Sequence, residues 1–415
     1  MKELSSLLKS RNFVRLWISQ IISQVVVNFL SFLLLVYLFE ITGSTVATSF
    51  IWVAYALPAV LFGPIAAVSA DVVDKRRLLT VALLIQSLVV AVLAMLHNRF
   101  IYLAYGIVFA YSLANQFYIP AEAASLPLFV KKQNLPFANS LFFLTVQSAF
   151  VLGFLFAGTS FEYLGMSVSL VLASGLLLVA YSSVSLLPRI VPSEKIPKDI
   201  SKGIVRFFSE LIEGYQFIRN NKRVFLPFIL LIGLQISLSV VVVSMPALAQ
   251  DLIKIRPRLA GFVIAVPAFI GALSSTILVS RAISRGVPRK RIVEISLFIL
   301  NTSLLVVGSI VPNVSFWIGR TLSVICFFTA GISYVGCLIP TLTHLQIATP
   351  SSKLGRVFGN IWFITTAFTV VPLLFSAAIT EVFGVGLMMS LLGLAGMLVF
   401  FYVEISRRNF LMINK

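Results

Sequence analysis

Apolar runs of membrane-spanning length recur from end to end of this 415-residue chain, and no other feature constrains its fold as strongly. A helix needs roughly 20 consecutive apolar residues to cross the hydrocarbon core of a bilayer. Hydrophobic residues make up 59% of the chain and charged residues 11%, whereas an average soluble domain has about 25% charged residues. The sequence therefore predicts an all-α polytopic membrane protein.

Twelve such runs can be placed, six on each side of a polar break. They lie at about 13–39, 46–70, 78–97, 101–126, 138–161, 166–187, 224–250, 259–283, 292–311, 315–346, 357–380 and 385–405. The polar break begins as a linker and continues with apolar residues at helical spacing, which is typical of an amphipathic helix at a membrane surface. We expect an N-terminal six-helix bundle over 1–187, a cytoplasmic linker with that helix over 188–223, and a C-terminal six-helix bundle over 224–415.

The positions of the basic residues predict the orientation. All but five of the 32 Lys and Arg residues lie at the termini, in the central linker or in the loops after spans 2, 4, 8 and 10. Basic residues accumulate in cytoplasmic loops, so both termini are expected in the cytoplasm. The same bias accounts for the formal net charge of +18 without a nucleic-acid partner. The five exceptions are Arg99, Lys254, Arg256, Arg258 and Arg320.

The loop after span 2 concentrates charge within the stretch "GPIAAVSADVVDKRRLL", residues 63–79. Its basic residues are explained by topology, but acidic residues contribute little to the orientation bias. Asp71 lies four residues before Lys75, so the two side chains can pair along one helical face. From the residues alone, Asp71 either has a purely topological role or pairs with Lys75.

This loop resembles the signature loop between spans 2 and 3 of the major facilitator superfamily, with Asp71 as its acid and Lys75 and Arg76 as its basic pair. Five further stretches, in the expected order, resemble the efflux branch that includes macrolide exporters and siderophore exporters. They are "SRNFVRLWISQIISQ", "ITGST", "YIPAEAASLPLFV", "ELIEGYQFIRNNKRV" and "LGRVFGNIW". The resemblance implies a bacterial inner-membrane or plasma-membrane transporter with two pseudo-symmetric six-helix bundles.

The resemblance also implies a gate on the cytoplasmic side. Asp71 would contact the start of span 11, in "SSKLGRVFGN", when that side is closed. Gly355 would allow the close approach, and Arg356 follows it directly. A carboxylate at a helix N-terminus gains about 0.3–1 kcal/mol at an exposed site.

Glu122 and His344 are the titratable candidates within the spans. Glu122 lies between Pro120 and Pro127, where an unpaired carboxylate is costly. It could pair with Lys75 in the same gate, bind the proton of a transport cycle, or be an ordinary solvated helix end. His344 could be protonatable, or a hydrogen-bonded structural histidine. Phe154 stands where the antiporter signature of span 5 has a proline, so proton coupling is less firmly implied than the fold.

Polar side chains at membrane depth face the bundle interior, where they pair with each other or line a path for a substrate. The candidates for such a cavity are Gln24, Asn28, Asn115, Gln116, Gln147, Gln235, Asn301, Asn360 and Trp362. For each of them, interhelical packing is at least as good an explanation. Outside the spans, His97 is expected to be solvated in a short outer loop.

The sequence contains no metal-ligand cluster, no phosphate-cradling glycine loop and no nucleophile arrangement, so we expect neither an enzyme nor a cofactor. Cys326 and Cys337 lie in one apolar run and are expected to be free, packed thiols. The leading hypothesis is a monomer that exports a bulky apolar or amphipathic small molecule, with protons as the coupling ion. One alternative is a translocator of lipid or lysolipid. An alternative of another class is a membrane sensor or scaffold that does not transport.

Overall fold

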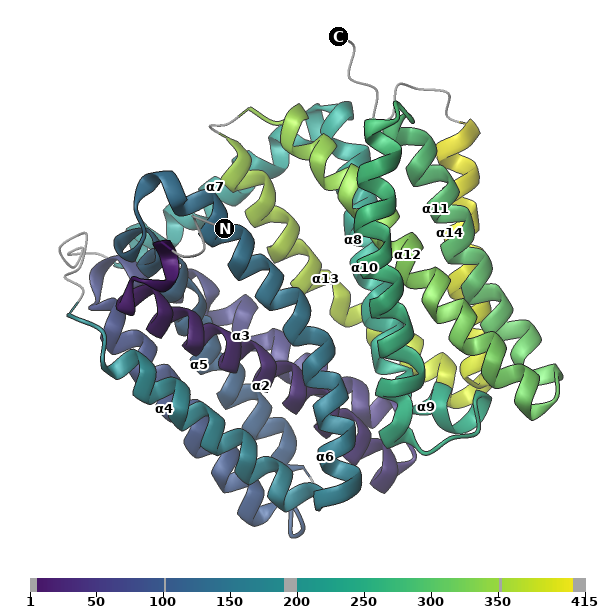
Figure 1. Ribbon diagram of the computed structural model, residues 1–415, viewed down its shortest axis with the longest axis horizontal. Helices are drawn as coiled ribbons and strands as arrows, with labels where there is room; N and C mark the ends of the chain where they lie inside the picture. The colour runs from purple at the N-terminus through teal and green to yellow at the C-terminus, as the bar shows by residue number, and fades with distance from the viewer. Residues whose placement is uncertain (1–5, 101, 190–199, 351–352, 406–415) are drawn as a thin grey trace. The chain divides into compact units, whose positions relative to one another are not determined.

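The computed structural model describes residues 6–100, 102–189, 200–350 and 353–405, and helices account for most of them (Figure 1). The chain forms two compact units. The first comprises Met1–Leu38 and Phe50–Phe208, and the second comprises Phe39–Ser49 and Ser209–Lys415. The short segment Phe39–Ser49 therefore belongs to the second unit, although helices of the first unit flank it in the sequence.

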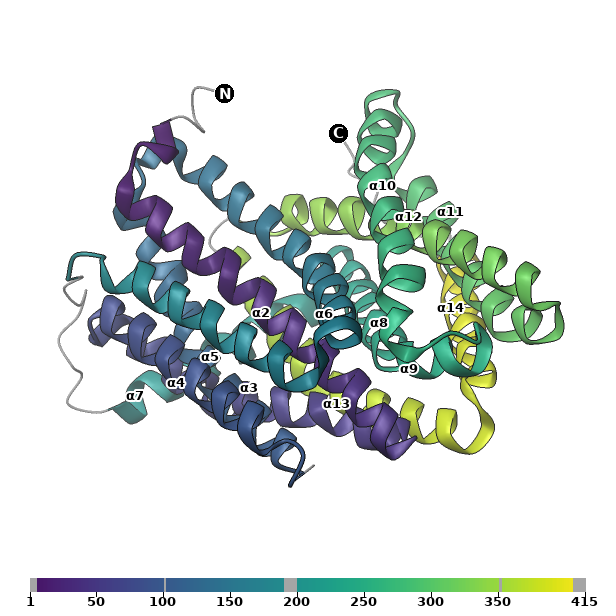
Figure 2. The same cartoon turned by 60° about the horizontal axis from the view of Figure 1, so that its bottom comes forward.

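The long helices of the first half pack as a bundle in which α4 lies against both α5 and α6 (Figure 2). Asp74 begins α4 as its N-cap, since its side chain accepts a hydrogen bond from the backbone N–H of Arg76 at 3.0 Å. The helices are α2 (Arg11–Thr42), α3 (Thr45–Val72), α4 (Lys75–Leu96), α5 (Leu103–Phe129) and α6 (Leu135–Ser185), with a short 3-10 turn, η1 (Lys132–Asn134), before α6.

Element α6 consists of two helices that meet at Gly165. This residue has φ 77° and ψ 175°, a left-handed conformation that glycine adopts without the steric cost of a side chain. Ser160 donates a hydrogen bond to the hydroxyl of Ser169 across this point. Nine residues of straight helix would separate the two by about 13 Å, so the chain reverses there.

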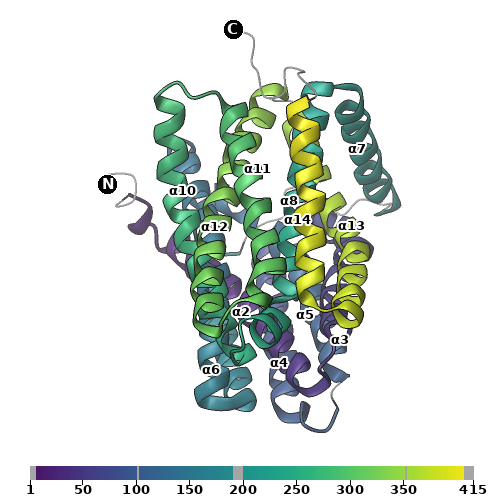
Figure 3. The same ribbon diagram turned by 90° about the vertical axis from the view of Figure 1, so that its right-hand side faces the viewer.

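In the second half, α12 packs against α8, α10 and α11, and α14 packs against α11 and α13 (Figure 3). The long helices are α7 (Ile200–Asn220), α8 (Lys222–Val243), α10 (Val266–Ser284), α11 (Arg289–Leu305), α12 (Phe316–Ala348), α13 (Leu354–Phe383) and α14 (Val385–Ile405). Short irregular turns connect them: α9 (Met245–Ala247), η2 (Leu248–Leu252), η3 (Pro257–Leu259), η4 (Gly261–Ala265), η5 (Val306–Ile310) and η6 (Val311–Asn313).

Two glycines let the backbones of α10 and α12 touch. A Cβ atom at Gly271 would lie 2.0 Å from the carbonyl oxygen of Phe328, and one at Gly331 would lie 1.9 Å from that of Ala268. Small residues at such crossings replace side-chain interdigitation with direct backbone packing, which is a common way for membrane helices to associate.

Within the described residues, ten helical stretches are long and apolar enough to cross a membrane. One of them contains both parts of α6, which Gly165 divides. Helix α5 is not among the ten, but its 27 residues are long enough to cross. These two additions account for the twelve spans expected from the sequence. The helix expected within the central linker is also present, as α7.

Candidate functional site

The charged loop of residues 71–77 lies between α3 and α4. Lys75 is buried, with 2% of its surface exposed, whereas Arg77 is exposed. The guanidinium of Arg76 donates a hydrogen bond to the carbonyl oxygen of Ser185, at the end of α6. Of the two basic residues assigned to the signature, one is thus enclosed by the first unit and the other ties α4 to α6.

The partner expected for this loop lies at the first turn of α13. Residue 71 belongs to the end of α3, and residues 355 and 356 belong to the first turn of α13. The structure describes the helical backbone at four of the predicted site residues but not their side chains. These residues are Asp71, Gly355, Arg356 and the cavity candidate Trp362. The latch between Asp71 and α13 therefore stays a prediction.

Glu122 is buried within the first unit, with 7% of its surface exposed. The hydroxyl of Tyr118, one turn earlier on α5, donates a hydrogen bond to its Oε1 at 3.1 Å. The same hydroxyl lies 2.8 Å from the hydroxyl of Ser19 on α2. A chain of three polar groups thus links the carboxyl group of Glu122 in α5 to Ser19 in α2. Because Glu122 is buried, it is not the ordinary solvated helix end that was one of its three possible roles.

A second polar network in the first unit contains the cavity candidate Asn115, which is 4% exposed. Its amide nitrogen donates to the hydroxyl of Tyr55 at 3.2 Å, and its oxygen accepts from Gln86 at 3.3 Å. Ser112 bonds the backbone carbonyl of Tyr55 at 2.6 Å. These contacts tie α5 to α3 and α4, so Asn115 has a packing role in this structure.

The remaining candidates of the first unit differ in environment. Asn28 donates to the carbonyl oxygen of Gln24 within α2, at 2.8 Å. A Cβ at Gly153 of α6 would lie 2.6 Å from the Cβ of Asn28, so α6 crosses α2 at this point. Gln116 is half-buried and bonds the carbonyl oxygen of Ser112 at 3.4 Å. Gln147 is exposed.

The candidates of the second unit take part in helix packing. Gln235 of α8 accepts a hydrogen bond from the hydroxyl of Tyr334 on α12. Asn301 is 4% exposed and bonds its own helix at Leu297. Asn360 is 2% exposed and donates to the carbonyl oxygen of Leu211 at 3.0 Å, which fastens α13 to α7.

The two histidines are both buried. The Nε2 of His344 lies 3.2 Å from the carbonyl oxygen of Arg223, at the start of α8, which fits the structural role considered for it. The expectation for His97 was wrong: it is 5% exposed. The hydroxyl of Tyr37 bonds its carbonyl oxygen at 3.1 Å, and its ring lies edge-on to that of Tyr37. The hydroxyl of Ser167 lies 3.5 Å from its Nε2, so α2 and α6 both cover the imidazole.

A further set of charged contacts was not expected from the sequence. Within the second unit, Arg258 forms a bidentate ion pair with Glu40, with N–O distances of 2.9 Å and 2.7 Å. Glu381, near the end of α13, accepts from the hydroxyl of Ser44 at 2.6 Å and from the backbone N–H of Val46 at 3.0 Å. This carboxylate lies at the N-terminus of α3, where negative charge is favourable. The ion pair and the cap hold segment Phe39–Ser49 in the second unit.

One sequence signal accompanies this set. Arg258 is one of the five basic residues on the predicted non-cytoplasmic side. Glu40 and Glu381 lie at the ends of their spans on that same predicted side. No pattern in the sequence, however, pairs residues 218 positions apart.

Cys326 and Cys337 are free and buried, as expected. Among the residues that the structure describes, no group of three or more His, Cys, Asp or Glu side chains is placed to hold a metal ion.

Comparison with known proteins identifies the architecture. The sequence pattern of the Major Facilitator Superfamily matches residues 16–367. The chain is 25% identical over 393 residues to macrolide efflux protein A of Streptococcus pyogenes, covering 90% of both chains. It is 22% identical over 362 residues to the uncharacterised MFS-type transporter YfiS of Bacillus subtilis (strain 168), covering 84% of this chain and 82% of that protein.

Solved structures of transporters share the fold. A bacterial homologue of the human lysosomal transporter Spinster, in an inward-facing and unoccupied conformation, matches with a TM-score of 0.75 and 12% identity, over 97% of this chain and 98% of that one. The POT family transporter PepTSo matches with a TM-score of 0.74 and 14% identity, over 98% and 99% of the two chains. At this level of identity the likeness concerns the fold alone, and it confirms the all-α architecture expected from the sequence.

Proposed function

Because the chain belongs to the Major Facilitator Superfamily and is therefore a multi-pass membrane transporter of small molecules rather than an enzyme, we propose that it exports a bulky apolar or amphipathic compound by alternating access. The main support is how the polar groups within its helices are used. Asn115, Asn360 and Gln235 bond other helices, and Asn301 bonds the backbone of its own helix. Because these four polar side chains are already bonded to protein groups, they favour a substrate that is held mainly by apolar contact.

The relatives agree with this proposal. Macrolide efflux protein A, which the chain resembles over 90% of its length, is named for the efflux of macrolides. Export of such a compound from the cytoplasm is consistent with cytoplasmic termini and residence in a bacterial inner or plasma membrane as a monomer.

We propose protons as the coupling ion, with Glu122 as the residue that binds them. A carboxyl group can take up and release a proton, and the hydrogen bond from the hydroxyl of Tyr118 holds the carboxyl group of Glu122 in place. Asp71, Lys75, Arg76, Gly355 and Arg356 would form the cytoplasmic gate. Translocation of lipid or lysolipid is the second candidate, since the same apolar path would suit an acyl chain.

Accumulation of substrate in cells tests the proposal. Bacteria that lack their own macrolide exporters would express this chain, and the intracellular level of a labelled macrolide would be compared with that in cells carrying the empty vector. We expect lower accumulation that returns to the vector level when a protonophore abolishes the proton gradient. Equal accumulation of every macrolide in a panel, together with export of a labelled lysolipid, would favour the second candidate.

A further inference from the structure

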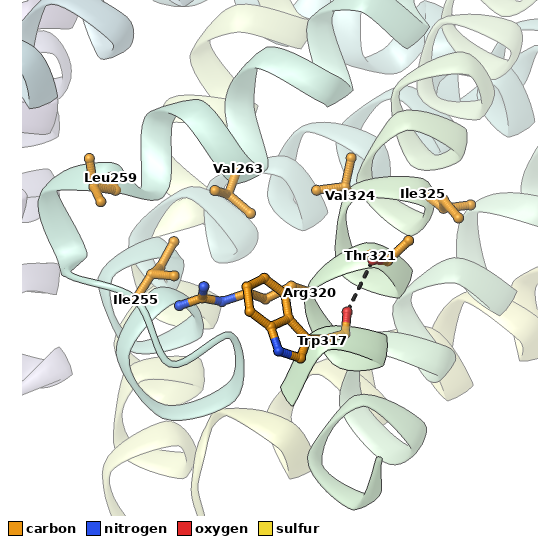
Figure 4. Close-up of a pocket in the computed structure, with 8 residues that line it drawn as sticks. All are labelled: Ile255, Leu259, Val263, Trp317, Arg320, Thr321, Val324 and Ile325. Atoms are coloured by element: carbon orange, nitrogen blue, oxygen red, sulfur yellow. Dashed lines mark hydrogen bonds between the residues drawn. The ribbon is translucent and has the colours of Figure 1, made fainter. Parts of the chain in front are cut away.

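The second unit contains an apolar groove with the side chain of Arg320 at one end (Figure 4). Its volume is about 520 Å³, within the range of roughly 300–1,000 Å³ that is usual for ligand pockets. Two stretches line it: the chain from the loop after η2 into α10, and the first turns of α12. The lining residues are Ile255, Leu259, Val263, Trp317, Arg320, Thr321, Val324 and Ile325.

The polar and apolar residues of the groove are segregated along α12. Arg320 and Trp317 lie at its start, and the Arg320 side chain extends toward Ile255 (Figure 4). Val324 and Ile325 lie one turn further along the helix, about 6 Å from Arg320 along the helix axis. Val263, on the stretch leading into α10, lies at their level in the same view.

Arg320 is held in place by neutral groups. Its Nε and Nη2 donate to the carbonyl oxygens of Ile253 and Lys254, at 3.3 Å and 2.9 Å, and its guanidinium stacks 3.8 Å from the ring centre of Phe316. No acidic side chain pairs with it among the residues that the structure describes. Its positive charge is thus fixed beside the groove, and none of the described acidic side chains neutralises it.

The position along the chain places this end of the groove at the membrane surface. Arg320 opens a helix that is apolar enough to span the membrane, and Trp317, which is 74% exposed, is of the type that lies at headgroup level. An anionic headgroup would supply the missing counter-charge, and its acyl chain would cover the apolar residues deeper in.

We infer that this groove binds one anionic phospholipid, with its phosphate on Arg320 and an acyl chain along Val263, Val324 and Ile325. With the termini in the cytoplasm, the lipid would belong to the opposite leaflet. The inference requires only that α12 crosses a membrane, so it does not depend on the transported substrate.

Native mass spectrometry of the purified full-length protein tests the inference. The protein is released from nanodiscs that contain phosphatidylglycerol and phosphatidylcholine with the same acyl chains. We expect the wild type to retain phosphatidylglycerol over phosphatidylcholine, and Arg320→Gln to retain about tenfold less of it, since a charge-assisted contact is lost. The matched control is Arg99→Gln, which removes an exposed basic residue of the same predicted side, from the first unit, and should retain as much lipid as the wild type.

A second variant keeps the charge and fills the groove. Val263→Trp should lower the retention of phosphatidylglycerol while leaving Arg320 intact, which separates lipid binding from any effect of Arg320 on folding. Equal retention of the two lipids by the wild type would overturn the inference. So would retention in Arg320→Gln equal to that in Arg99→Gln, or unchanged retention in Val263→Trp.

Discussion

Glu122 is the acidic residue whose position in the bundle bears most directly on energy coupling. Replacing it with glutamine keeps the size and the ability to accept the hydrogen bond from Tyr118, but it removes the exchangeable proton. If Glu122 binds the coupling proton, Glu122→Gln should abolish the response of transport to a pH gradient while the protein still binds substrate. Flux into proteoliposomes, with and without an imposed gradient, measures this.

The control for that variant is Tyr118→Phe, which keeps the carboxyl group and removes its hydrogen-bond donor. It should lower stability by about 0.5–1.5 kcal/mol, the usual net contribution of one hydrogen bond, and retain the response to the gradient. A Glu122→Gln protein that still responds to the pH gradient at an unchanged rate would exclude this residue as the coupling site.

The ion pair between Glu40 and Arg258 allows a second test with single residues. Its side chains are 23% and 31% exposed, so solvent screens it, but its bidentate geometry is favourable. A double-mutant cycle with Glu40→Gln and Arg258→Gln should give a coupling free energy of about 0.5–1 kcal/mol that shrinks as salt is added. Unfolding of the solubilised protein provides the measurement.

The pair Lys290–Glu294 is a matched control within the same unit. It is an i,i+4 pair on α11 with a longer N–O distance of 3.5 Å, and such pairs couple by about 0.3–0.5 kcal/mol. A coupling between Glu40 and Arg258 that is indistinguishable from zero would mean that segment Phe39–Ser49 is held by the Glu381 cap and by packing instead.

Single-residue environments were the least predictable part of the sequence. His97 was expected in solvent because it lies in a short outer loop, but Tyr37, 60 positions away, covers it. Asn360 was a cavity candidate, but it bonds a backbone carbonyl of α7. An amide side chain in an apolar run shows that a partner must exist, but the sequence does not identify the partner, because it comes from a distant helix.

At the scale of helices, the crossing of α10 and α12 depends on the absence of side chains at Gly271 and Gly331. Gly331→Ala should destabilise the protein by roughly 1–3 kcal/mol, the usual cost of overpacking, because its Cβ would meet the backbone of Ala268 at 1.9 Å. Thermal unfolding in detergent would show this as a lower midpoint.

Gly233→Ala is the matched control for that substitution. Gly233 lies within α8, and a Cβ there would meet nothing within 4 Å. Alanine is the better helix former by about 0.8–1 kcal/mol, so this variant should be as stable as the wild type or more so. Equal destabilisation of the two variants would show that backbone contact between α10 and α12 does not govern stability.

The helices themselves were largely predictable, because the length of an apolar run and the thickness of a bilayer are matched quantities. The boundary between the fifth and sixth spans was expected at residues 161–166, and the structure places the reversal at Gly165. Helix α5 was predicted as a span from the sequence although it contains the polar residues Asn115 and Glu122. The assignment of Phe39–Ser49 to the second unit was not foreseeable, since it rests on long-range contacts of Glu40, Ser44 and Val46.

At the scale of the whole molecule, the cytoplasmic gate makes a prediction about populations. If Asp71 contacts the N-terminus of α13, Asp71→Asn should weaken the state closed on the cytoplasmic side by about 1–2 kcal/mol, a shift of roughly 5- to 30-fold in the equilibrium between two states. Arg77→Gln, which alters an exposed neighbour of the same loop, should shift it much less. Distance spectroscopy in lipid, with labels at the cytoplasmic ends of α3 and α13, reports the two populations. Identical distance distributions for the wild type and Asp71→Asn would leave residue 71 with a topological role alone.

The central claim is that this chain moves an apolar small molecule across the membrane, and flux into sealed proteoliposomes tests it most directly. The purified protein would be reconstituted, and a labelled macrolide or lysolipid that binds it would be added outside, with protein-free liposomes as the reference. We predict that the bound compound also accumulates in the lumen, and that an imposed pH gradient changes the rate. Saturable binding to the protein with luminal entry no faster than in protein-free liposomes, for every compound that binds, would contradict the claim and favour a sensor.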